Sequence, residues 1–437
     1  MFLNERLIVG CLITLAIALG VASIFVLGKD NIAFSDTYDY IVAAKSLLGN
    51  GTYPNVGSLP FFRAPLYPIF IALIWSAVPE SIFAVKLVQV AMHAGVVVFV
   101  YVGSKLIWEN WIAAGISGLL VAINPFFLYH AAAIQTEALH TFLVTLGVLV
   151  IVALTAGHKR FFWLSIGGGL VFGLAALCKP SALGLGVVAA ALMLFLRSGS
   201  DRRITLPILF VASMFATILP WSFYNLATKG EFILVNDAGG YALWLGNHEA
   251  NLRTYEESFD NLKDLQDYHE NVSKTVTAKQ IEEWNVTKGY SELSLGGREA
   301  LWRDAAIEKA RNDPSQAIRL DLWKLWGFWK PNLNRDVYGR TASILSGLFM
   351  LPLYLFGAVG LALTASEIRT RKIAWLFVAM AIFITAVHVL IVSNLRLRIP
   401  YIDPWLMAFA GFGLTSVCKK FVGRLKGNEV SREAIHC

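Results

Sequence analysis

Long apolar runs, separated by short polar or Pro/Gly-containing breaks, dominate the pattern of this chain. A transmembrane helix needs about 20 mostly apolar residues to cross a hydrocarbon core about 30 Å thick. Ten runs approach or exceed this length, at residues 7–28, 81–104, 111–128, 138–156, 162–178, 181–196, 204–224, 343–365, 373–393 and 402–418. The pattern predicts an all-α polytopic membrane protein with about ten transmembrane helices.

Two longer segments interrupt these runs, and we expect both to face water on the same side. The first, residues 29–80, contains a short apolar stretch at 64–79 that opens with two prolines, which we interpret as interfacial or re-entrant rather than as a crossing. The second, residues 225–340, holds 18 of the 30 acidic residues. The expected organisation is an N-terminal transmembrane module (1–224), an α-rich extracytoplasmic domain (225–340), C-terminal transmembrane helices (341–418) and a cytoplasmic tail (419–437).

Composition agrees with a membrane protein, since 56% of the 437 residues are hydrophobic and 15% are charged. Short loops rich in Lys and Arg stay in the cytoplasm, and a cytoplasmic N-terminus puts basic clusters such as 158–160 and 369–372 on that side. The net charge of +7 is then a topology signal and requires no nucleic-acid partner. The first apolar run lacks a small-residue cleavage site, so we expect a retained helix.

Four basic residues lie where this topology places the outer membrane surface, which the positive-inside rule disfavours: Arg63, Lys179, Arg396 and Arg398. Cationic side chains bind phosphate, and lipid phosphate is the anion present at that depth. Snorkelling of single cations to resident anionic lipids is the alternative interpretation. In an extended loop, alternation would present Arg396 and Arg398 on one side.

Acidic residues also occur at the outer face, where a carboxylate inside a membrane segment costs about 2.5–3.5 kcal/mol. Asp36 and Asp39 are three positions apart in SDTYDYIVAAKSLL and would share a helical face, with Tyr40 beside them. Asp36 is either a functional carboxylate or the N-cap of that helix. Glu137 is expected at the outer end of the fourth span, where a helix N-terminus favours a carboxylate without any further role.

The sequence leaves a metal requirement open. Glu137 and His140 have an i, i+3 spacing that can ligate a metal, but one E-x-x-H motif does not define a site. The four cysteines are scattered and predict neither a disulfide framework nor a zinc site. Trp323, Trp326 and Trp329 recur at i, i+3, i+6 on an expected helix that follows the turn at Asp313-Pro314, and they fit an interfacial anchor or a sugar or lipid platform.

Six motifs follow one another in an order that resembles the GT-C family of bacterial membrane glycosyltransferases, similar to the protein O-mannosyltransferases and the aminoarabinose transferase of lipid A. They are Asp36-Tyr40-Ala44 in the first loop, Arg63-x-Pro-x-Tyr-Pro, Thr136-Glu-x-Leu, Lys179-Pro, Pro220-Trp with its Asn-Gly-Gly sequel, and Arg396-x-Arg-x-Pro. The similarity runs from about residue 5 to 418. Tyr224 stands where the family usually has arginine, and the element with which the aminoarabinose enzyme holds a metal has no clear counterpart.

The resemblance implies transfer of a sugar from a polyprenyl-phosphate carrier to an envelope lipid, glycan or protein acceptor, with inversion, at the outer face of the inner (plasma) membrane. The first loop, 29–80, would be catalytic, and no certain cofactor is implied. The residues matched to catalysis are Asp36 as general base, with Asp39, Tyr40 and Glu137 in support. The cations matched to the lipid phosphate are Arg63, Lys179, Arg396 and Arg398. The residues matched to the sugar or its loop are Tyr67, Asn236 and Asn247, of which the two asparagines also fit plain turns.

Two other functions stay open on the sequence alone. A lipid-linked sugar flippase or proton-coupled transporter would use Asp36, Glu137 and His388 as a proton relay, and it predicts charges near the middle of several helices. In this sequence the charges gather at the outer ends instead. A non-catalytic lipid-binding assembly protein would use residues 225–340 to recruit its partners.

Overall fold

The computed structural model describes residues 2–30, 35–54, 63–156, 160–196, 204–248, 262–333 and 335–433, and all regular elements in these ranges are helices. The first ten are α1 (Phe2–Leu27), α2 (Ser35–Asn50), α3 (Leu66–Ala77), α4 (Ile82–Trp108), α5 (Trp111–Ala122), α6 (Pro125–Ala132), α7 (Thr136–Thr155), α8 (Phe161–Cys178), α9 (Ser181–Leu196) and α10 (Thr205–Lys229). The others are α11 (Gly239–Gly246), α13 (Leu262–Lys288), the 3-10 helix η1 (Tyr290–Glu292), α14 (Leu295–Asn312), α15 (Pro314–Trp329), α16 (Arg335–Ser366), α17 (Arg371–Leu390), α18 (Leu395–Arg398) and α19 (Asp403–Glu433). The all-α prediction is confirmed.

Seven helices in the described part of the chain are long and apolar enough to cross a membrane: α1, α4, α7, α8, α10, α16 and α17. The bent pair α5 and α6 makes an eighth if it is one broken span. Helices α3 and α9 are apolar but shorter, and at 1.5 Å per residue the 12 residues of α3 cover about 18 Å. The protein is therefore a multi-pass membrane protein, whereas the expected count of ten crossings is not confirmed.

The expected crossing at 111–128 is broken because Asn124 and Pro125 start a new helix. The side chain of Asn124 accepts hydrogen bonds from the backbone N–H groups of Phe126 and Phe127, and Pro125 occupies the first turn of α6. The axes of α5 and α6 differ by 50°.

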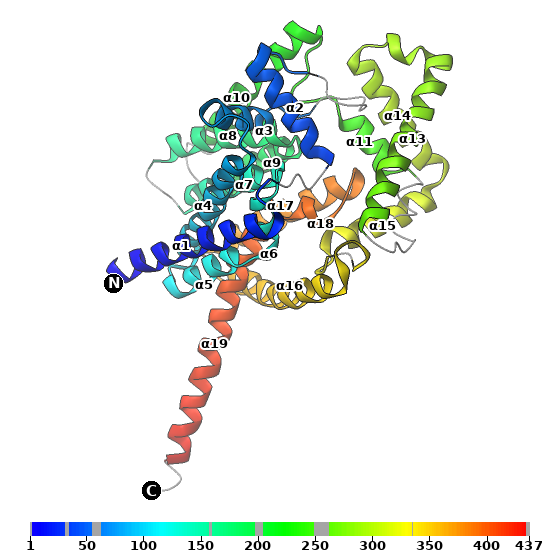
Figure 1. Cartoon of the computed structure of the whole chain (residues 1–437). Helices are drawn as coiled ribbons and strands as arrows, with labels where there is room; N and C mark the ends of the chain where they lie inside the picture. The colour runs from blue at the N-terminus through cyan, green and yellow to red at the C-terminus, as the bar shows by residue number, and fades with distance from the viewer. Residues whose placement is uncertain are drawn as a thin grey trace.

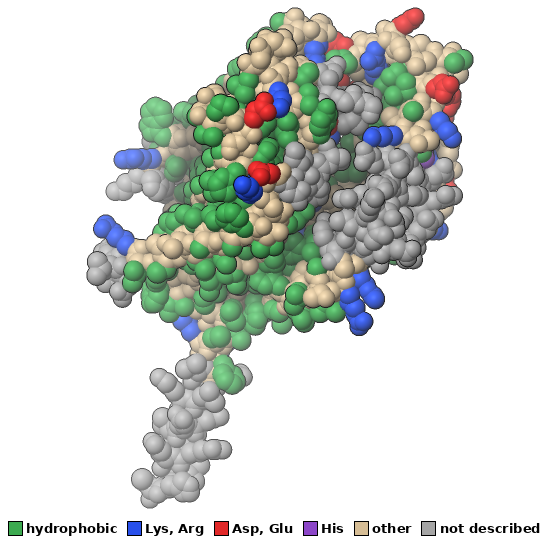
Figure 2. All heavy atoms as spheres, in the orientation of Figure 1, with side chains coloured by type: hydrophobic (Ala, Val, Ile, Leu, Met, Phe, Trp, Pro, Cys, Tyr) green, Lys and Arg blue, Asp and Glu red, His purple; other side chains and the backbone are tan. Residues whose placement is uncertain are grey.

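Close helix packing in the bundle depends on glycine. A Cβ atom on Gly169 of α8 would lie 2.1 Å from the carbonyl oxygen of Phe210 on α10, and one on Gly360 of α16 would lie 2.0 Å from that of Phe409 on α19. Small residues let backbones approach within the membrane, where lipid-facing apolar surface gives no driving force for association. Figure 2 shows hydrophobic side chains over much of the bundle surface.

Helices α11, α13 and α14 stand beside one another, away from α1 and α5 (Figure 1). They enclose a separate cluster of buried aromatic side chains: Tyr241, Trp244, Trp284, Tyr290 and Trp302. This cluster lies within the segment expected to be extracytoplasmic, although the domain boundaries stay predictions. The turn expected at Asp313-Pro314 is confirmed, since α14 ends at Asn312 and the Asp313 side chain caps α15.

The three tryptophans of α15 do not share one environment. Trp323 and Trp326 are exposed, whereas Trp329 is partly buried against the main hydrophobic core. Ile318 and Leu322 are also exposed, with 62% and 61% of their surface accessible. Helix α15 therefore exposes apolar side chains, among them Ile318, Leu322 and Trp326, and its interfacial role stays a prediction.

Candidate active site

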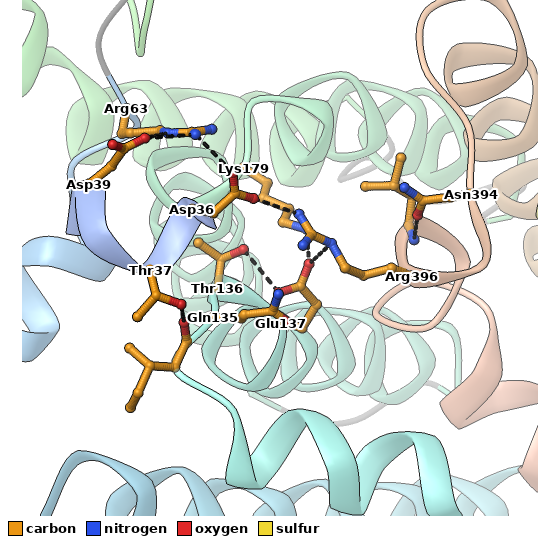
Figure 3. A network of polar contacts seen from close by, with 12 residues as sticks. Asp36, Thr37, Asp39, Arg63, Gln135, Thr136, Glu137, Lys179, Asn394 and Arg396 are labelled. Carbon is orange, nitrogen blue, oxygen red and sulfur yellow. Dashed lines mark hydrogen bonds and ion pairs between the residues drawn. The ribbon is translucent and has the colours of Figure 1, made fainter. Parts of the chain in front are cut away.

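Six charged side chains from five separate parts of the chain meet near the start of α7 and the end of α8 (Figure 3). They are Asp36 and Asp39 of α2, Arg63 before α3, Glu137 in the first turn of α7, Lys179 between α8 and α9, and Arg396 of α18. Because each contacts at least one other, they lie on the same side of the membrane. We call this group the ion-pair chain.

The position of α2 is fixed by a buried hydrogen bond. Thr37 is fully buried, and its hydroxyl donates to the carbonyl oxygen of Ile134 at 2.8 Å. Ile134 lies in the connection before α7, so this contact holds the first turn of α2, with Asp36, close to the first turn of α7, with Glu137. Single-sequence reasoning did not select Thr37, because nothing in the local pattern distinguishes this hydroxyl from others.

Asp36 lies between two arginines. Nη2 of Arg63 donates to Oδ1 at 2.9 Å, and Nη2 of Arg396 donates to Oδ2 at 3.0 Å. Burial opposes ionisation, but the two guanidinium groups outweigh it and hold the pKa of Asp36 below its usual value. The carboxylate is therefore ionised near neutral pH, and it binds the arginines instead of acting as the helix cap that the sequence left open.

Arg63 also contacts Asp39, one helical turn along α2. Its Nε donates to Oδ2 of Asp39 at 2.9 Å, and its Nη2 lies 2.8 Å from the same oxygen. Burial raises the pKa of Asp39 above its usual value, and the attraction of Arg63 only partly offsets this. Asp39 therefore orients Arg63, while the carboxylates of neighbouring turns differ in their tendency to hold a proton.

Glu137 is fully buried and has two cationic partners. Nε of Arg396 lies 2.9 Å and Nζ of Lys179 2.7 Å from its Oε1. A buried carboxylate is tolerated only when it is paired and hydrogen-bonded. Arg396 thus bridges Glu137 to Asp36, and Lys179, predicted from its Lys-Pro motif, ends the chain of contacts.

The expectation of an extended loop that presents Arg396 and Arg398 together is wrong. Residues 395–398 form a helical turn, in which side chains two positions apart point in directions about 200° apart. Arg398 is fully buried and forms a bidentate pair with Asp403, at 2.8 and 3.1 Å, and also donates to the carbonyl oxygen of Phe328. These contacts give Arg398 a role in packing α18 against α15 and α19.

Two predicted tyrosines support the ion-pair chain. The Tyr40 ring lies beneath the guanidinium of Arg63, 5.8 Å from ring centre to Cζ, and meets the Tyr67 ring edge-on at 5.1 Å. The Tyr67 hydroxyl donates to Gln89 at 2.6 Å, and the Gln89 amide donates to the carbonyl oxygens of Ala131 and Ala133. Tyr67 is fully buried, so its position fits scaffolding rather than the predicted sugar contact.

The predicted asparagines lie elsewhere. Asn247 ends α11, where it donates to the carbonyl oxygen of Leu390 and accepts from Nζ of Lys324. Asn236 is partly exposed in the connection between α10 and α11. Tyr224, where the family usually has arginine, accepts a hydrogen bond at its hydroxyl from the backbone N–H of Tyr53. It therefore ties the segment that follows α2 to α10.

The histidines near the ion-pair chain pack against an aromatic ring. The rings of His140 and His388 lie 4.9 and 5.9 Å from that of Tyr401, whose hydroxyl is 2.5 Å from that of Ser181. Within the described ranges, no three His, Cys, Asp or Glu side chains are placed to hold a metal ion. The E-x-x-H spacing of Glu137 and His140 therefore does not extend to a ligand set there.

Comparison with known proteins places this geometry in a family context. The profile of the dolichyl-phosphate-mannose-protein mannosyltransferase family matches residues 62–224. This segment includes Arg63, Glu137 and Lys179 but not Asp36 or Arg396. No curated protein matches the chain.

Solved structures match almost the whole chain at low identity. The oligosaccharyltransferase AglB of Archaeoglobus fulgidus matches in its apo form with a TM-score of 0.58 and 13% identity, over 97% of this chain and 52% of that one. Its complex with an inhibitory peptide and a dolichol-phosphate gives 0.56 and 14%, over 96% and 52%. ArnT of Cupriavidus metallidurans bound to undecaprenyl phosphate gives 0.44 and 14%, over 92% and 77%.

The chain spans about half the length of the AglB chains that it matches. At such identity the likeness concerns the fold alone, and that fold is the GT-C fold. The resemblance drawn from the six motifs is thereby confirmed.

Proposed function

We propose that this protein transfers a sugar from a polyprenyl-phosphate carrier to an acceptor at the extracytoplasmic face of the plasma membrane, with inversion at the anomeric carbon. The observation that supports it best is the position of Asp36, a partly exposed carboxylate between the guanidinium groups of Arg63 and Arg396. A carboxylate that can act as a base and two guanidinium groups that can bind an anion are thus within hydrogen-bond distance of one another. The family profile and the AglB fold agree with a lipid-linked donor.

The chemistry follows from the properties of the donor. The acceptor oxygen or nitrogen attacks the anomeric carbon and forms the new bond. The bond between that carbon and the phosphate oxygen breaks, and its electron pair leaves with the phosphate. Asp36 takes the acceptor proton. Phosphate is a good leaving group, so the departing side needs cations instead of a second acid, and Arg63, Arg396 and Lys179 supply them.

One base is sufficient for this reaction. Glycoside hydrolases need two carboxylates, one on each side of the scissile bond, because one of them must protonate a poor leaving group. Here Asp39 and Glu137 are already paired to the cations, which fits roles in orienting Arg63 and Arg396. The role of Glu137 in this scheme is to fix Arg396 and Lys179 at the height of the lipid phosphate.

The acceptor is proposed to enter from the side of residues 225–340. Helix α14 in this segment is tied to the end of α10 by Glu231, whose carboxylate accepts from the backbone N–H of Gly296 at 2.8 Å. The segment is joined to the bundle through α15, which packs against α17 and α18. Envelope lipids, glycans and proteins all remain acceptor classes to be tested.

The direct test is release of carrier phosphate by purified protein that receives a polyprenyl-phosphate sugar and a mixture of envelope acceptors. We expect Asp36→Asn to reduce turnover at least about 100-fold, within the range that general-base catalysis supplies. The matched control is Glu80→Gln, which removes an exposed carboxylate of the same loop that pairs with Lys45. Turnover of Asp36→Asn equal to that of the control would refute the role of Asp36.

A further inference from the structure

The ion-pair chain is electrically balanced. Three carboxylates, Asp36, Asp39 and Glu137, alternate with three cations, Arg63, Arg396 and Lys179, so the formal charges of these described residues sum to zero. Other titratable groups also interact with members of this chain: Tyr40, Tyr53, Tyr67, His130, His140, Cys178, Tyr241, His388 and Tyr401. Burial raises the pKa of Tyr40, which keeps this phenol neutral. In its resting state the site thus has no excess positive charge for a phosphate.

The proposed reaction presents this site with two different anions. The donor is a phosphodiester with one negative charge, whereas the product lipid is a phosphate monoester with about −1.5 to −2 at pH 7. Transfer therefore adds about one negative charge to the phosphate and, in the same step, moves one proton from the acceptor onto Asp36. The sum of charges in the site is unchanged, because the proton compensates the added charge.

We propose that the protonation state of Asp36 controls the affinity of the site for a phosphate monoester, so that loss of the proton to water expels the product lipid. This inference rests on the proposed function. Protonated Asp36 no longer competes for Arg63 and Arg396, which then bind the monoester. When the proton leaves, the ionised carboxylate forms its ion pairs with both arginines again, and the phosphate loses these partners.

The geometry selects Asp36 among the three carboxylates. Asp36 contacts both arginines, one through each oxygen. In the described part of the chain, Asp39 pairs with Arg63, and Glu137 pairs with Arg396 and Lys179. Water also reaches Asp36, since 26% of its side chain is exposed, compared with 11% for Asp39 and none for Glu137. A proton on Asp36 therefore has a route to solvent. The low pKa of Asp36 in the resting site agrees with rapid return of the proton.

The test is calorimetric binding of geranyl phosphate, a short polyprenyl phosphate monoester, to the full-length protein in detergent at pH 7.5. Titrations in two buffers of different ionisation enthalpy give the number of protons taken up on binding. At this pH the phosphate is mostly dianionic. We expect wild-type protein to take up close to one proton more than Asp36→Asn, and Asp36→Asn to bind geranyl phosphate at least about tenfold more tightly. Glu80→Gln, the matched control, removes an exposed carboxylate of the same loop and keeps the wild-type proton uptake.

Several outcomes would overturn the proposal. Equal proton uptake by wild type and Asp36→Asn, or weaker binding by Asp36→Asn, contradicts it. If Asp36→Asn does not fold, Asp36→Ala serves in its place. Proton uptake near zero by the wild-type protein contradicts the proposal without any variant. Inorganic phosphate and geraniol separate recognition of the phosphate from recognition of the lipid, and proton-linked binding of inorganic phosphate by wild type supports the same gate.

Binding requires neither a sugar donor nor an acceptor, so the two proposals fail separately. A protein that transfers sugar but shows no proton-linked binding contradicts the gate alone. A protein that shows proton-linked binding but no transfer with any donor contradicts the transferase function alone.

Discussion

The carboxylate of Asp36 and the guanidinium of Arg396 lie 3.0 Å apart although 360 positions separate them in the chain. This contact joins the first loop to the short α18 turn between the last two long helices. Because Arg396 also pairs with the buried Glu137, it is the member of the ion-pair chain that connects the other five, three carboxylates and two cations, to the C-terminal helices.

Removing Arg396 is expected to damage both stability and transfer. Arg396→Ala leaves the fully buried Glu137 with Lys179 as its described partner, and breaking a buried pair costs up to about 3–5 kcal/mol, reduced here because Arg396 is 30% exposed. We expect a lower melting temperature and a rise in the donor KM together with a loss in kcat. Arg369→Ala, which breaks the exposed pair with Glu109, should change neither. Equal effects of the two substitutions would contradict a special role of Arg396.

The lowered pKa of Asp36 leads us to expect a loss of stability at low pH. Its folded-state pKa is below the unfolded value, so ionised Asp36 contributes stability that is fully present above the unfolded pKa near 3.8 and is lost as pH falls through the folded pKa. The difference in melting temperature between wild type and Asp36→Asn should therefore be constant from pH 5 to 8 and shift against wild type below pH 4. For the same reason kcat/KM should show no acid limb from Asp36 above pH 5.

Asp39 predicts a pH dependence of opposite sign. Its folded-state pKa is above the unfolded value, so its contribution is fully present below the unfolded pKa and is lost as pH rises through the folded pKa. Relative to Asp39→Asn, wild type should lose stability between about pH 4 and the folded pKa of Asp39. Melting curves of both proteins across pH 3–8 measure this, and parallel curves would contradict it.

Thr37 is expected to position Asp36. Thr37→Val keeps the shape but removes the hydrogen bond to Ile134 and leaves a buried carbonyl without this donor, at a cost of about 1–3 kcal/mol. We expect a lower kcat with little change in the donor KM, because Asp36 moves while the cations stay. Thr37→Ser retains the hydroxyl and should restore kcat. A Thr37→Val enzyme with wild-type kcat would remove Thr37 from the account.

Helix packing between α8 and α10 should tolerate substitution at one glycine but not at its neighbour on the same helix. Gly169→Ala puts a Cβ 2.1 Å from a backbone oxygen of α10, whereas a Cβ at Gly167 meets nothing within 4 Å. Overpacking costs about 1–3 kcal/mol. Thermal unfolding in detergent should show a lower melting temperature for Gly169→Ala and an unchanged melting temperature for Gly167→Ala.

The exposed face of α15 is expected to contact the lipid interface. In vesicles that contain brominated lipids, Trp326 should be quenched, because 58% of it is exposed, whereas Trp302 is 1% exposed. The measurement compares quenching of Trp326→Phe and Trp302→Phe with that of wild type. A smaller quenched fraction in Trp326→Phe alone is expected, and no difference between the variants would refute the interfacial placement.

Sequence patterns predicted the features that depend on local chemistry. Apolar periodicity gave the helical class, Thr136-Glu137 marked the start of α7, and Asp313-Pro314 marked the start of α15. The break at Asn124-Pro125 was missed although its signal is local, since Asn-Pro is a typical turn dipeptide. An apolar run on both sides of the dipeptide concealed it.

Features that depend on tertiary contacts were not predictable in the same way. The positive-inside rule disfavours cations at the outer membrane surface, and this argument pointed to Arg63, Lys179 and Arg396. These three side chains do lie in one site. The same argument selected Arg398, because charge alone does not reveal that Asp403 is its partner. Thr37 carries no charge and no motif, so only its contact with Ile134 reveals it.

The distance in sequence between the two ends of the ion-pair chain has a consequence for biogenesis. Arg396 emerges from the ribosome only after more than 390 residues have been made, so Asp36 and Glu137 cannot pair with it during most of synthesis. A nascent or truncated chain that stops before α18 has three carboxylates but two cations in this group. Such a chain lacks one of the two arginines that flank Asp36, so under the proposed function transfer would begin only when the last helices are inserted.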